Sequence, residues 1–202
     1  MKKLMYIIFA VILAACNDNP SNPNNENEHD LPTTLKIHIY QLNDSGNGEI
    51  KDSSITLFDQ PGGPGTPITL TPITLKFDNS KSTFYKAEIE VLNKSNSSNI
   101  IDVTKEIKLE AEYHQFFFTT LQKNKALITY GDKESDYTST NLNGSDLPVG
   151  LKFLIEVPKN ASVSNDTLSI SLSHFPDATK KDGVTAGNET DIFVNFPIIY
   201  QK

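Results

Sequence analysis

The stretch Thr34-Leu-Lys-Ile-His-Ile-Tyr40 decides the fold, because apolar and polar side chains alternate along it without a break. Leu35, Ile37 and Ile39 fall on one side of an extended chain. Alternation with a period of two is typical of a strand that has one face on a core and the other in water. The stretch therefore predicts a half-buried antiparallel strand with His38 on its solvent face.

Similar short apolar segments recur as far as residue 200. We expect further strands at 54–58, 68–77, 83–92, 115–120, 126–130, 151–157, 167–173 and 192–200. Polar segments rich in Gly, Pro, Asn, Asp and Ser separate them, and the longest are at 131–149 and 174–190. Short strands at this spacing predict one all-β domain over 33–202, an antiparallel immunoglobulin-like β-sandwich.

The segment 102–113 fits two patterns. Val103, Ile107 and Ala111 are four residues apart, as on one face of a helix, whereas the second half of the segment also alternates as a strand does. We favour one short helix or irregular segment here, with Asp102 as its N-cap.

The N-terminus has the pattern of an export signal. Lys2 and Lys3 precede twelve mostly apolar residues, too few to span a bilayer as a helix, which needs roughly 20. Leu13-Ala-Ala-Cys16 resembles the lipobox of bacterial lipoproteins, in which the cysteine sulfur is acylated and the peptide is cut just before it. We expect residues 1–15 to be a signal peptide and Cys16 to be the lipidation site. An ordinary secretory peptide is the alternative, but Cys16 is the only cysteine.

Residues 16–32 predict a lipid-anchored, disordered tether. They are rich in Asn, Pro and acidic residues and have almost nothing apolar to bury. A flexible coil of this length spans about 20–25 Å. We therefore expect the domain to be held at the outer membrane or cell surface, with the membrane as a partner through its anchor.

Composition excludes several functions. Loss of residues 1–15 removes two of the 18 lysines and leaves 16 against 25 acidic residues, a formal charge of −9 with no arginine. Such a chain is poorly suited to nucleic acid, whose binding depends on neutralised phosphates. It also lacks a G-x-S-x-G elbow, a P-loop and an H-E-x-x-H pair. We expect a monomer without enzyme activity or a nucleic-acid partner.

The candidate metal ligands are His114 and His174 together with Glu112, Glu189 and Asp191. Imidazole and carboxylate groups are the usual ligands of divalent transition metals, and neighbouring antiparallel strands could bring the two histidines together. The alternative is that each imidazole satisfies backbone groups at a strand end. No cofactor other than such a metal is expected.

Acidic residues in polar segments are candidates for a binding loop. They are Asp59, Asp132 and Asp177. Glu189-Thr-Asp191 precedes the last expected strand and could form a ligand rim, or could guard an edge strand against pairing with another chain. Asp166-Thr-Leu168 resembles a short O-glycosylation signal of Bacteroidota.

Several longer motifs carry a family resemblance. They are Glu112-Tyr-His-Gln-Phe-Phe-Phe118, Thr129-Tyr-Gly-Asp132, Leu147-Pro-Val-Gly-Leu151, Leu172-Ser-His-Phe-Pro-Asp177 and Gly187-Asn-Glu-Thr-Asp-Ile192. Together they resemble small Bacteroidota lipoproteins described as containing a type 1 periplasmic binding domain. The resemblance implies a surface or periplasmic accessory protein, in some cases beside a TonB-dependent transporter. Two functions follow as hypotheses, a non-catalytic lipoprotein that binds a small ligand, and a structural or adhesive module that binds protein or glycan.

Overall fold

The computed structural model describes residues 31–43, 50–63, 65–119, 121–139, 142 and 144–202. The predicted signal peptide, the lipidation site Cys16 and nearly all of the predicted tether lie outside these ranges. No helix within them is long and apolar enough to cross a membrane.

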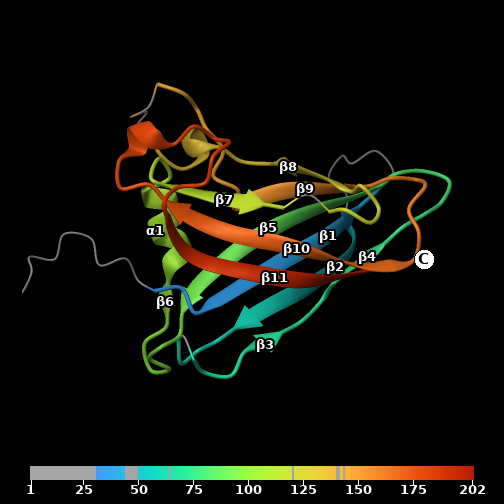
Figure 1. Cartoon of the computed structure of the whole chain (residues 1–202), viewed down its shortest axis with the longest axis horizontal. Helices are drawn as coiled ribbons and strands as arrows, with labels where there is room; N and C mark the ends of the chain where they lie inside the picture. The colour runs from blue at the N-terminus through green and yellow to red at the C-terminus, as the bar shows by residue number, and fades with distance from the viewer. Residues whose placement is uncertain (1–30, 44–49, 64, 120, 140–141, 143) are drawn as a thin grey trace, which may run out of the picture.

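In the described ranges, eleven strands form two sheets that pack face to face around one core (Figure 1). The larger sheet has the order β3 (Thr69–Leu70), β2 (Ile50–Asp59), β1 (Thr34–Leu42), β5 (Thr83–Asn93), β9 (Lys152–Val157) and β8 (Leu127–Tyr130), and β6 (Ile101–Asp102) also pairs with β5. The smaller sheet has the order β4 (Ile73–Lys76), β11 (Glu189–Gln201), β10 (Ser164–His174) and β7 (His114–Phe118). The predicted all-β sandwich is confirmed.

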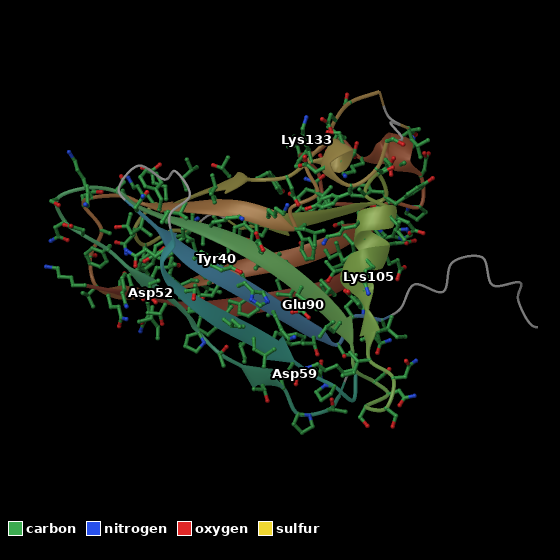
Figure 2. The ribbon with its side chains drawn as sticks, turned by 180° about the vertical axis from the view of Figure 1, so that it is seen from behind. Tyr40, Asp52, Asp59, Glu90, Lys105 and Lys133 are labelled. Atoms are coloured by element: carbon green, nitrogen blue, oxygen red, sulfur yellow. The ribbon has the colours of Figure 1, made fainter. Side chains whose placement is uncertain are left out.

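β1 has the predicted alternation. Leu35, Ile37 and Ile39 are buried in the core, and His38 lies on the outer face of the larger sheet. Its Nε2 atom is 3.3 Å from a carboxylate oxygen of Glu90 on β5, which Figure 2 shows on the same outer face.

The expected single strand over 68–77 is wrong. The chain forms β3 in the larger sheet, leaves it at Thr71-Pro72, and enters the smaller sheet as β4. Pro72 has no N–H to continue a ladder, so the strand ends there. β4 then runs parallel to β11, and the sandwich is therefore not purely antiparallel.

The predicted short helix is present as α1 (Val103–Leu109), and it stands across one end of the sandwich (Figure 1). Val103, Thr104 and Ile107 form its buried face, and the Thr104 hydroxyl accepts a hydrogen bond from the Val91 N–H of β5 at 2.8 Å. Asp102 is the N-cap residue, as predicted, but its side chain makes no capping hydrogen bond. β10 ends beside α1, and β7 and β11 begin there.

Candidate functional site

The two candidate histidines are direct neighbours at this end of the smaller sheet. His114 is the first residue of β7 and His174 the last of β10, and the antiparallel register places them opposite each other. Their rings stack with centroids 5.0 Å apart and planes inclined by 28°. The fold thus brings together two imidazoles that are sixty residues apart in the sequence.

Each imidazole is oriented through its Nδ1 atom. Nδ1 of His114 lies 3.0 Å from the carbonyl oxygen of Glu110 at the end of α1, and Nδ1 of His174 lies 3.0 Å from Oε2 of Glu189. A carbonyl oxygen can only accept, so Nδ1 of His114 is the nitrogen that donates. In the neutral ring the lone pair is therefore on Nε2. This is the orientation typical of histidines that ligate metals, whose other ring nitrogen donates to a carbonyl or carboxylate.

A β-bulge positions Asp191. The register of β10 with β11 shifts between Leu172, which pairs with Ile192, and Ser173, which pairs with Thr190, so Asp191 is the extra residue. Bulges change the direction of side chains and are frequent beside functional sites. The Asp191 carboxylate lies 3.9 Å from Nε2 of His114, whose side chain is only 2% exposed.

The interpretation of Glu189 and Asp191 as protectors of an edge stays a prediction. β4 pairs with β11 only over Ile198–Gln201, so the start of β11 pairs with β10 on one side and lies beyond β4 on the other. Both residues also face a histidine, and the Glu189 side chain is 58% exposed. The structure therefore groups four of the five candidate metal ligands.

Glu112, the fifth candidate, belongs to a different polar group. It is buried, and its Oε1 atom accepts a 3.4 Å hydrogen bond from the Thr138 hydroxyl. The same group contains Lys181, whose ammonium lies 2.8 Å from Oε1 of Glu134 and donates to the Ala111 carbonyl at 2.8 Å. Burial lowers the pKa of Lys181, although Glu134 and Glu112 oppose that shift. Lys181 supplies the positive charge among these carboxylates, so Glu112 has a structural role.

Asp132, a candidate for a binding loop, also serves the fold. Its carboxylate accepts bonds from the Tyr137 hydroxyl at 2.7 Å, the Gly150 N–H at 2.7 Å and the Lys152 N–H at 3.0 Å. Burial raises the pKa of Asp132 against these hydrogen bonds. Gly150 has a φ of +87°, and a Cβ there would lie 2.8 Å from that of Phe116. Asp132 therefore holds a tight turn, and a ligand role for it stays a prediction.

The other two loop candidates have local partners as well. Asp59, at the end of β2 (Figure 2), accepts a hydrogen bond from the Thr34 hydroxyl and lies 3.1 Å from the Lys94 ammonium. Asp177 precedes the short 3-10 helix Ala178–Lys180 and accepts from both the N–H and the hydroxyl of Thr179, which lowers its pKa. Thr167 of the glycosylation motif is exposed on β10, and its modification stays a prediction.

A hollow of about 660 Å³ lies on the opposite side of the domain and escaped the sequence analysis. Its lining includes Asp52 of β2, Lys76 at the end of β4, Asp78 just after it, and Phe84 of β5. Lys76 pairs with Asp52 at 2.8 Å across the two sheets. These residues come from strands or strand ends whose meeting depends on the sheet topology, so no local sequence signal marks the hollow.

The histidine cluster is not a closed metal cage. Within the described ranges, no three His, Cys, Asp or Glu side chains are already arranged to hold an ion. No protein-family model, curated protein or solved structure matches this chain. A proposal for the function of this chain therefore rests on the geometry of its own residues.

Proposed function

We propose that this chain is a membrane-anchored, non-catalytic lipoprotein whose β-sandwich captures a divalent transition-metal ion at the histidine pair. The observation that carries the proposal is the orientation of His114. A backbone carbonyl fixes Nδ1, and the lone-pair nitrogen Nε2 lies beside the carboxylate of Asp191. Imidazole nitrogen and carboxylate oxygen are the ligands that zinc-like ions prefer.

A small movement is enough to bring these two groups onto one ion. Ligand atoms on a tetrahedral zinc lie about 3.4 Å apart, given bonds of about 2.1 Å. The observed separation between Nε2 of His114 and Oδ2 of Asp191 is 3.9 Å. Closing this gap by about 0.5 Å needs only an adjustment of the Asp191 side chain, which is 21% exposed.

The anchor and the resemblance support a role at the membrane. A lipid on Cys16 would hold the domain within a tether length of the bilayer, where a captured ion could be passed to a transporter. Some of the similar Bacteroidota lipoproteins accompany TonB-dependent transporters. In this proposal the protein is an accessory that binds the ion before transport at the outer membrane or cell surface.

Calorimetry tests the proposal with a matched control. Zinc is titrated into the protein without added histidines, and into the His114→Ala and His38→Ala variants. His38 also faces a carboxylate, at 3.3 Å from Glu90, but on the open outer face of the larger sheet. We expect one zinc per chain, with binding lost in His114→Ala and kept in His38→Ala. Identical titrations of all three proteins would contradict the proposal.

One observation favours the adhesive alternative as a second candidate. Phe193 is 60% exposed on β11, beside Ser171 of β10 in the register, on the outer face of the smaller sheet. An exposed aromatic ring among small polar side chains is suited to stacking on a sugar or another protein. In that case Phe193→Ala would weaken cell-surface adhesion, and His114→Ala would leave adhesion unchanged.

A further inference from the structure

A small cavity lies beside the histidine pair, where the chain enters the domain. Its volume is about 60 Å³, and its walls include Leu31 and Pro32. His114 and Asp191 line the cavity, and so does Glu106 of α1. Apolar side chains from α1 and β10 complete the wall. No local pattern in the sequence marks Glu106 as a ligand, because its position beside His114 depends on the tertiary fold.

Three residues that line the cavity carry ligand-type side chains and come from three elements. They are not already arranged to hold an ion, so binding requires their side chains to move toward one another. Glu106 is half-buried on α1, His114 begins β7, and Asp191 is the bulge residue of β11. Glu110, one turn after Glu106 and the C-cap of α1, supplies the carbonyl that orients His114. One imidazole and two carboxylates around a small cavity form a set of nitrogen and oxygen donors suited to a divalent ion.

We propose that the ion binds in this cavity, with Nε2 of His114 and the carboxylates of Asp191 and Glu106 as its three protein ligands. The inference rests on the proposed function and adds the position of the ion and its third ligand. His174 does not line the cavity, and it acts as a positioning residue that stacks on the His114 ring.

The size of the cavity and the donor set define the class of ion. A water needs about 10–15 Å³ of such space, so 60 Å³ accommodates an ion and at least one water as a fourth ligand. The only sulfur atoms of the chain belong to Met1, Met5 and Cys16, outside the domain. Without thiolate or thioether ligands, the site selects zinc-like divalent ions over copper(I).

The test uses isosteric removal of a charge. Zinc chloride is titrated into wild type, Glu106→Gln and a matched control, Glu90→Gln, which removes a carboxylate beside the imidazole of His38 on the open face. Equal thermal unfolding without zinc shows that each variant is folded, and Glu106→Asp replaces Glu106→Gln if that variant unfolds. We expect zinc affinity to fall at least about tenfold in the Glu106 variant and to be unchanged in Glu90→Gln.

The possible failures are distinguishable. If wild type and Glu106→Gln bind zinc equally while His114→Ala does not, the ion is held at the histidine pair without Glu106, and the inference is overturned. If wild type binds no zinc, the proposed function itself fails. A tenfold loss in Glu90→Gln as well would mean that general negative charge rather than the cavity attracts zinc, which also overturns the inference.

Discussion

The ammonium of Lys181 lies 2.8 Å from Oε1 of Glu134, and neither side chain reaches solvent beyond 2% of its surface. Glu134 belongs to the 3-10 helix Glu134–Asp136, and Lys181 follows the second 3-10 helix, Ala178–Lys180. The pair therefore joins two loops that cover the α1 end of the sandwich, next to the proposed site.

We expect Lys181→Met to lower the free energy of unfolding by about 3–5 kcal/mol, because it leaves the buried Glu134 carboxylate without its cation. The double variant Lys181→Met, Glu134→Gln should recover part of this loss, since it removes both charges. Exposed Lys180→Met is the control and should change stability by less than about 0.5 kcal/mol. Urea denaturation measures all three, and a loss below 1 kcal/mol in Lys181→Met would rule out a stabilising role for the pair.

We expect the stability of the domain to depend on pH through Asp146, an exposed residue of the same region. The Lys133 ammonium and the Ser135 N–H hold the pKa of Asp146 at about 2, below its ordinary value of 3.8. A lowered carboxyl pKa gives stability that is present above pH 3.8 and is lost as the pH falls through about 2. In an NMR titration, Asp146 should titrate near 2 in wild type and closer to 3.8 in Lys133→Met. Equal pKa values of Asp146 in both proteins would show that Lys133 does not lower this pKa.

Membrane attachment depends on one atom in our account, the sulfur of Cys16. Cys16→Ser should move the protein from the membrane fraction to the soluble fraction and abolish palmitate labelling, because the thioether cannot form. Zinc affinity of the released protein should be unchanged, since the site lies in the domain. Labelled palmitate in the Cys16→Ser protein would disprove the lipobox assignment.

The sequence predicts the fold class because alternation in β1, β5 and β9 directly reports which side chains face the core. It mispredicts 68–77 because both halves are apolar, although Pro72 is a signal that could have divided them. The N-cap position of Asp102 is predicted correctly, but the sequence does not show that its side chain leaves the helix N–H groups without a bond.

Only part of the proposed metal site could be predicted from the sequence. Local patterns place His114 and His174 at strand ends, but their contact depends on β7 pairing with β10, which is a non-local choice. The bulge at Asp191 leaves no mark in the alternation. Lys181 reads as one of two adjacent solvated lysines, and only the tertiary fold shows that it is the buried one.

The most direct test of the central claim is anomalous diffraction at the zinc absorption edge from crystals of the protein grown with zinc. The account predicts one strong peak about 2.0–2.1 Å from Nε2 of His114, within the cavity that Asp191 and Glu106 line. Crystals with no peak at His114, or with peaks only at surface groups such as His38 and Glu90, would contradict it.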